Sequence, residues 1–220
     1  LSDHNVAIGN DALATHNTGS SIDAYNVAVG SGAGAAVTTG KQNTFIGGNV
    51  GDANTTADNN VAVGFNSLTT NTTGASNTAV GKGALSDNTT ASNNTAVGLE
   101  SLNLNTTGAN NTAVGKDSLK ANTTGDTNTA LGYRALLANT TGADNTAVGA
   151  DALVSNTTGA SNSALGHDAL AANTTGANNV AIGVFALDAN TTGDTNVAVG
   201  NVALSANTTA DGNSAFGHEA

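Results

Sequence analysis

Four histidines are the side chains of this 220-residue chain best suited to metal binding or proton transfer. They are His4, His16, His167 and His218, and their separations match neither a zinc site nor a catalytic triad. An acidic residue follows His167 and another follows His218, in stretches that tolerate charge. We therefore expect four solvated histidines, with no catalytic residue, no metal and no cofactor.

Acidic side chains and one glycine-rich stretch suggest two other binding chemistries. The scattered Asp residues could hold Ca²⁺ between successive repeats, although the calcium-roll motif Gly-Gly-x-Gly-x-Asp is absent. Calcium stays an open alternative. Residues 30–35 read Gly-Ser-Gly-Ala-Gly-Ala and superficially match a dinucleotide fingerprint. No βαβ unit follows them, so we expect no phosphate loop.

Threonine recurs in the sequence Asn-Thr-Thr, in ten copies that begin at Asn54. This sequence is an acceptor for N-glycosylation in eukaryotes, and it is also typical of turns. In a bacterial protein we favour the turn. Regularly spaced threonines on a β-solenoid can also form a lattice suited to ice, so ice binding is retained as an alternative. Here the Thr pair lies beside Gly in a predicted turn.

Composition excludes several classes of protein. The net charge is −11 with only five Lys and Arg residues, which excludes a basic nucleic-acid binder. The absence of Cys excludes disulfides, a thiolate nucleophile and a Cys-type zinc site. We find no apolar run long enough to insert into a membrane and no signal peptide. The chain opens almost directly on a repeat and stops within one, so we expect a segment whose export signal and anchor lie elsewhere.

A repeated unit must position all of these residues. Its marker is an Asn followed four residues later by a Gly; the first interval between markers is 21 residues and every later one is 17. We number positions in the unit as columns, with the marker Asn in column 0. We expect the Asn side chains to stack as ladders at the turns and the column 4 Gly to need a positive φ. The regular marker pairs are Asn60 and Gly64, Asn77 and Gly81, Asn94 and Gly98, Asn111 and Gly115, Asn128 and Gly132, Asn145 and Gly149, Asn162 and Gly166, Asn179 and Gly183, and Asn196 and Gly200.

The unit predicts short strands. Columns 1 to 3 hold small and β-branched residues, which predicts one strand closed by the column 4 Gly. A second short strand is predicted around column 7 (Ala or Ser) and column 8 (Leu). Packed helix pairs need about 33 residues, so the fold class is all-β: a parallel β-solenoid of about 13 coils, roughly 60 Å long. Residues predicted to pack in the core or between chains are Ala79, Val80, Leu85, Ala96, Val97, Leu102, Ala113, Val114, Leu119, Ala147, Val148 and Leu153.

The chain divides into two parts of one solenoid. Residues 1–59 are irregular, because they contain the long first interval and carry Gly34 and Gly51 in place of the column 8 Leu. Residues 60–220 are regular and are truncated at the C-terminal end. From the second repeat onward, every charged residue falls in columns 5, 6, 9, 10, 15 or 16.

The uncharged columns 1 to 3 predict neighbouring chains. Side chains alternate between the two faces of a strand, so a strand without charge on either face is buried on both. A 17-residue coil is too thin to cover both. We therefore expect the first strand to pack against other chains, with the small Ala of column 2 allowing close approach. The simplest assembly is a closed three-fold bundle.

The repeat resembles the head repeats of trimeric autotransporter adhesins, whose motif is close to Asn-Ser-Val-Ala-Ile-Gly. Asn-Val-Ala-Val-Gly occurs at residues 26–30, 60–64 and 196–200, and Asn-Val-Ala-Ile-Gly at 5–9 and 179–183. The resemblance implies a left-handed β-roll, a homotrimer, a bacterial surface location and a role in attachment. The usual unit is about 14 residues; units of 17 are similar to those of trimeric fibre proteins of bacteria and phages.

These observations predict a non-enzymatic, extracellular adhesive fibre or head segment. Its expected partners are further copies of the chain and a molecule on a host cell, prey cell or matrix, with neither nucleic acid nor inserted membrane. A purely structural fibre shaft is the alternative, followed by ice binding. If the segment makes contacts, we expect them at the exposed turns and in the irregular N-terminal part.

Overall fold

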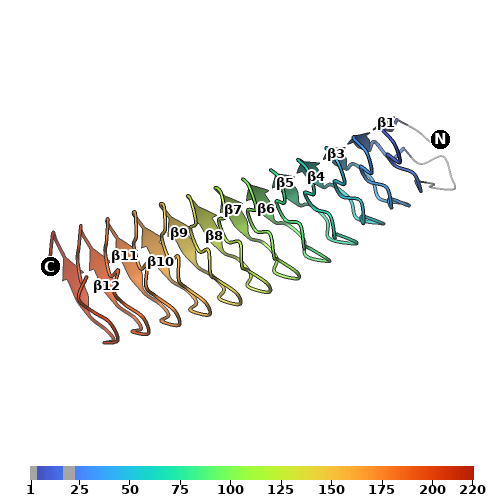
Figure 1. Cartoon of the computed structure of the whole chain (residues 1–220). Helices are drawn as coiled ribbons and strands as arrows, with labels where there is room; N and C mark the ends of the chain where they lie inside the picture. The colour runs from blue at the N-terminus through green and yellow to red at the C-terminus, as the bar shows by residue number, and fades with distance from the viewer. Residues whose placement is uncertain (1–3, 17–22) are drawn as a thin grey trace.

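The computed structural model describes residues 4–16 and 23–220, which form one parallel sheet with one short strand per coil. Strands adjacent in the sheet are also consecutive in the chain, and Figure 1 shows them along one side of a rod. The predicted all-β, parallel solenoid with a 17-residue period is confirmed. The strands are β1 (Val6–Ile8), β2 (Val27–Val29), β3 (Thr44–Ile46), β4 (Val61–Val63), β5 (Thr78–Val80), β6 (Thr95–Val97), β7 (Thr112–Val114), β8 (Thr129–Leu131), β9 (Thr146–Val148), β10 (Ser163–Leu165), β11 (Val180–Ile182), β12 (Val197–Val199) and β13 (Ser214–Phe216).

Strand register repeats the columns of the sequence. Thr78 pairs with Thr95 and Ala79 with Ala96, and the same in-register pairing runs from β1 to β13. The N–H of Thr78 donates to the carbonyl of Asn94 at 2.8 Å. Each column is therefore a row of like side chains about 4.8 Å apart along the rod. Across the described ranges, no helix is long and apolar enough to cross a membrane.

The core lies inside each coil. The Ala of column 2, the Ala or Ser of column 7 and the Leu of column 8 are fully or almost fully buried in the regular coils before the C-terminal end, as at Ala79, Ala84 and Leu85. The expectation that column 2 packs against other chains is wrong. Alternation along the strand turns column 2 into the coil and columns 1 and 3 outward. The small Ala is required because the facing Leu fills the narrow interior.

The second predicted strand is also wrong, because columns 5 to 10 form consecutive turns in the described coils. Leu85 and the other column 8 leucines have positive φ near 50°, as do the residues of column 6. This backbone bends the chain so that the N–H of Ala84 bonds back to Gly81, whereas the N–H of Leu85 reaches the carbonyl of Ser101 in the next coil. A left-handed conformation costs a non-glycine residue about 1–2 kcal/mol. Coil-to-coil hydrogen bonds and Leu burial offset that cost.

The N-terminal coils fill the same interior differently. Phe45 replaces the column 2 Ala and is fully buried. An added Cβ would lie 2.9 Å from its ring at Gly34 and 2.5 Å from it at Gly51. The two glycines that replace column 8 Leu therefore make room for one large ring. Residues 17–22, which include part of the long first interval, lie outside the described residues.

Candidate interaction surfaces

The column 0 Asn residues form a buried ladder on the inside of the turn that precedes each strand. The amide oxygen of Asn60 accepts the backbone N–H of Asn77 at 2.9 Å, and the amide nitrogen of Asn77 donates to the carbonyl of Ala91 at 2.9 Å. The pattern recurs at each regular marker. These side chains are fully buried, so they satisfy backbone groups and offer nothing to a ligand.

A second Asn ladder runs through column 11. Asn88 donates its amide N–H groups to Asn71 at 2.8 Å and to the carbonyl of Ala91 at 3.0 Å. The column 11 Asn side chains from Asn54 to Asn190 are fully buried, so these Asn-Thr-Thr copies are closed to glycosylation in the folded chain. The following Thr89 donates its hydroxyl to the carbonyl of Thr106, whereas the second threonine, Thr90, is exposed.

The column 4 glycines hold the backbone where two coils come closest. Gly98 has φ +140°, and an added Cβ would lie 2.5 Å from the carbonyl oxygen of Gly115. The same approach of coil to coil recurs at the regular markers from Gly64 to Gly200. Of the predicted ladder and core residues, only the column 3 valines, such as Val80, Val97, Val114 and Val148, point away from the coil interior.

The side chains of columns 1 and 3 form the outer strand face. It carries Val, Thr or Ser in column 1 and Val, Ile, Leu or Phe in column 3, without one charge from β1 to β13. Val114, Leu131, Leu165 and Ile182 are exposed on it. A strip one side-chain pair wide along thirteen strands covers roughly 400 Å². The largest apolar patch on an ordinary monomer has a similar area and is often functional.

Threonine is concentrated in the middle of the outer strand face. Column 1 is Thr in five consecutive strands, β5 to β9, beside a column 3 row of Val or Leu. The in-register pairing holds these hydroxyl and methyl groups in a regular two-dimensional array. The Asn-Thr-Thr turn carries only one exposed Thr row.

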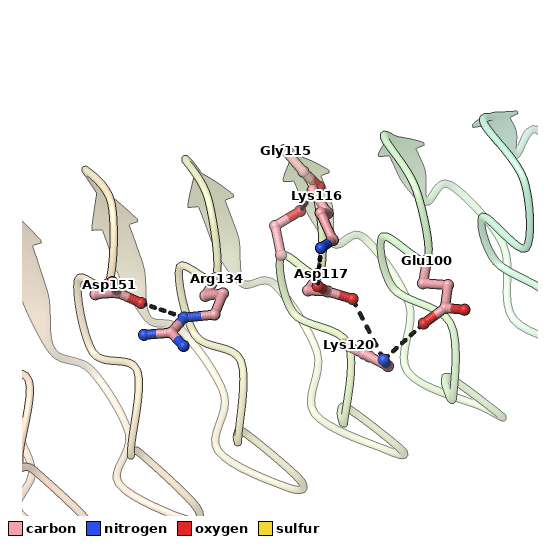
Figure 2. Close-up of polar contacts among 8 residues, drawn as sticks. Glu100, Gly115, Lys116, Asp117, Lys120, Arg134 and Asp151 are labelled. Atoms are coloured by element: carbon pink, nitrogen blue, oxygen red, sulfur yellow. Dashed lines mark hydrogen bonds and ion pairs between the residues drawn. The ribbon is translucent and has the colours of Figure 1, made fainter.

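Columns 5, 6 and 9 form a charged ridge beside the sheet (Figure 2). The ammonium of Lys120 lies 2.6 Å from Glu100 and 3.3 Å from Asp117, and the Nε of Arg134 lies 2.6 Å from Asp151. Glu100 raises the pKa of the Lys120 ammonium by accepting its hydrogen bond. The core columns repeat the same residues, whereas the residues of the ridge differ from coil to coil. A partner could therefore distinguish one coil from another at the ridge.

Aromatic rings interrupt the ridge. Tyr133 is 45% exposed, with the guanidinium carbon of Arg134 5.1 Å and the ammonium of Lys116 5.8 Å from its ring centroid. Phe65 and Phe185 are also exposed in columns 5 and 6. Rings held beside charges are suited to contacts with a partner surface.

One group on the ridge has the composition of a metal site. Ligand atoms of Asp151, His167 and Asp168 all lie within 4.8 Å of one another. The Nδ1 of His167 is 2.8 Å from Asp168. The sequence predicts a solvated pair at His167 and Asp168, but linear spacing gives no sign of their partner Asp151, which lies sixteen residues before His167. Column numbering could have found it, because column 6 of one coil meets columns 5 and 6 of the next.

The remaining histidines differ in their surroundings. His4 stacks on Tyr25 and lies 3.0 Å from Asp23, which also accepts the phenol of Tyr25. These two bonds hold the pKa of the Asp23 carboxyl below its usual value. His16 departs from the expectation of a solvated ring: within the described part of the chain both its nitrogens are buried without a partner, and burial lowers its pKa. It occupies column 11, where later coils carry the ladder Asn.

No protein-family model, no curated protein and no solved structure matches the chain. The resemblance to adhesin heads therefore rests on the repeat motif.

Proposed function

We propose that this chain is a segment of a non-enzymatic, extracellular attachment fibre, in which three copies join along their outer strand faces. The observation that carries the proposal is the uncharged outer strand face, which runs the whole length of the ladder. Burial of this face against further copies explains why no charge enters it, since a charged side chain there would be desolvated without a partner. The left-handed, trimeric β-roll and its bacterial surface location come from the motif resemblance.

Attachment is assigned to the charged ridge and the exposed turns, because both remain on the outside when the outer strand faces meet. The ridge presents aromatic and charged groups that change from coil to coil, whereas the turns present a repeated row such as Thr73, Thr90 and Thr107. Repetition along the rod and between copies lets weak contacts add through avidity. The partner is a molecule on a host cell, prey cell or matrix.

Mass in solution tests the assembly. We expect light scattering to give about three times the 21.1 kDa of one chain. Val114→Asp and Leu131→Asp place charges on the outer strand face and should release folded monomers or unfold the assembly. The matched substitution Thr107→Asp changes an exposed turn and should leave the mass unchanged. A wild-type chain that is a stable, folded monomer at micromolar concentration contradicts the proposal.

Two in-register deletions of equal length test attachment. Removal of residues 111–144 takes out two coils with the Lys116–Arg134 part of the ridge, and removal of residues 60–93 takes out two coils without it. Beads carrying each trimer are counted on cultured animal cells and on bacterial lawns. Adhesion requires a larger loss for the first deletion. Equal, small losses favour the alternative, a purely structural shaft.

Ice binding is a second candidate because of the five-strand Thr array on the outer strand face. It requires this face to be free in solution, so it competes directly with assembly. Thermal hysteresis of the purified chain, abolished by Thr112→Leu, would support ice binding. Smooth, round ice growth at millimolar concentration would exclude it.

A further inference from the structure

Two pairs of acidic side chains occupy column 6 in successive coils of the charged ridge, and a lysine bridges only the first pair. Glu100 and Asp117 belong to adjacent coils, and the ammonium of Lys120 contacts both carboxylates, at 2.6 and 3.3 Å (Figure 2). A protein cation thus compensates two carboxylates that the 17-residue stacking brings together. Lys120 lies in column 9 of the same coil as Asp117.

The second pair, Asp151 and Asp168, also occupies column 6 of two adjacent coils, three coils after the first pair. Its column 9 residue is Ala171, and within the described ranges no Lys or Arg forms an ion pair with Asp168. Instead, the column 5 residue beside Asp168 is His167, whose ring nitrogen joins the two carboxylates within 4.8 Å. An imidazole thus stands beside the second pair, where the first pair has the bridging ammonium of Lys120.

We propose that Asp151, His167 and Asp168 bind one divalent transition-metal ion of the Zn²⁺ type. One imidazole and two carboxylates provide three ligands, and water completes a tetrahedral site. An imidazole favours Zn²⁺ and its neighbours over Ca²⁺ and Mg²⁺, which prefer all-oxygen ligands. The ion takes the role that the Lys120 ammonium has in the first pair.

Hydrogen bonds between coils fix the backbone at both aspartates. The N–H of Asp151 donates to Tyr133 at 2.9 Å, and the N–H of Asp168 donates to Ala150 at 3.1 Å. The two side chains are only 16% and 25% exposed, whereas the His167 ring is 53% exposed and can turn toward the ion. Arg134 bonds one oxygen of Asp151, Oδ1, and so orients a carboxylate whose second oxygen can act as a ligand.

The site joins two consecutive coils, since Asp151 belongs to the coil of β9 and the other two ligands to the coil of β10. Metal binding should therefore stabilise the stacking of the β9 coil on the β10 coil. A ligand that binds only the folded chain raises its melting temperature by mass action.

The test is calorimetric titration of the metal-free chain with ZnCl₂ at pH 7.5. We expect one ion per chain. His167→Lys copies the Lys116–Asp117 arrangement that the coil of β7 already accommodates, and should weaken binding by about tenfold or more. Ala171→Lys leaves all three ligands intact but introduces the counterpart of Lys120, and should weaken binding as much. Circular dichroism verifies that each variant is folded.

His218→Ala is the matched control. His218 also precedes an acidic residue in columns 5 and 6, but the preceding coil offers Val202 in place of a carboxylate. This variant should bind Zn²⁺ as the wild type does.

The metal site would be overturned by the absence of saturable Zn²⁺ binding, or by unchanged affinity in both His167→Lys and Ala171→Lys. Displacement of Zn²⁺ by a tenfold excess of Ca²⁺ would also overturn it, by showing a nonspecific acidic surface. Loss of attachment in the deletion experiment bears on the fibre proposal alone.

Discussion

The N-terminal coils and the regular coils fill the same core with different side chains. In the regular coils an Ala in column 2 faces a Leu in column 8, as Ala79 and Leu85 do. In the N-terminal coils the large residue has moved to column 2, where Phe45 lies between Gly34 and Gly51. The coil interior therefore requires a certain total side-chain volume, and the large side chain can come from either column 2 or column 8.

The backbone ladder does not differ between the two regions. Gly30 and Gly98 have almost the same φ, 138° and 140°, and each lies against the corresponding Gly of the next coil. The column 0 Asn bonds also begin in the N-terminal region, where Asn26 accepts the N–H of Asn43 at 2.9 Å. Columns 0 and 4 therefore keep their Asn and Gly in both regions, whereas the apolar columns exchange residues in a compensated way and column 11 carries His16 and Val37 before its Asn ladder begins.

Removal of the large N-terminal side chain should have the largest effect. Phe45→Ala leaves a cavity that the two glycines cannot fill, and should lower the free energy of unfolding by about 3–5 kcal/mol in urea titration. The triple variant Phe45→Ala, Gly34→Leu, Gly51→Leu rebuilds the regular filling. Both glycines have φ near the +53° of the regular leucines. If the triple variant is no more stable than Phe45→Ala, core filling is not interchangeable between the regions.

Glycine substitution should be equally harmful in both regions. Gly98→Ala and Gly30→Ala each force a Cβ against the neighbouring backbone at a positive φ, with an expected loss of about 3 kcal/mol. Thr107→Ala, at an exposed turn position, should change stability by less than about 0.5 kcal/mol. A silent Gly30→Ala would mean that the N-terminal coils do not share the ladder.

Substitution of a column 11 residue should lower stability most where Asn neighbours lie on both sides of it. Asn122→Val inserts the residue that the N-terminal region has at Val37, and deprives Asn105 and Asn139 of a hydrogen-bond partner. We expect a loss of about 1–3 kcal/mol by thermal or urea unfolding. Val37→Asn should change stability less, because it extends a ladder at its end. Equal losses would argue against the ladder as the reason for Asn.

Neutralising the acidic residues of column 9 should produce the smallest change in stability, and the change should be a gain in both regions. Burial raises the pKa of Asp52 in the N-terminal part and of Asp188 in the regular part. The folded chain therefore favours the protonated acid over the carboxylate. The stability that the protonated acid contributes is present below the ordinary pKa of Asp and is lost as the pH rises through the raised pKa of the folded chain.

Asp52→Asn and Asp188→Asn should each stabilise the chain at pH 7, by less than about 1 kcal/mol after solvent screening. The advantage over the wild type should shrink toward pH 3. Urea unfolding at the two pH values measures it. An advantage that grows at low pH would contradict desolvation as the cause.

Sequence periodicity predicted the parallel ladder, the number of coils and the positive φ of the marker glycines. It failed on the second segment because leucine at positive φ is rare, so nothing in the residue types of columns 5 to 10 indicated consecutive turns. It also missed the group of Asp151, His167 and Asp168, because linear spacing hides contacts between columns of adjacent coils. In the sequence, Gly34, Phe45 and Gly51 are only three departures from the repeat. The structure shows that the Phe45 ring fills the space that leucines would occupy at the two glycines.

The sequence by itself determined the period, and the period alone sets which residues stack, since a parallel ladder aligns each column with itself. Only the tertiary structure decided which columns face inward. Columns 1 to 3 are all uncharged, so composition cannot distinguish the side of the strand that meets Leu85 from the side that faces outward. Closure of the coil by the turns of columns 5 to 10 makes that choice, because it brings the column 8 Leu against the column 2 Ala.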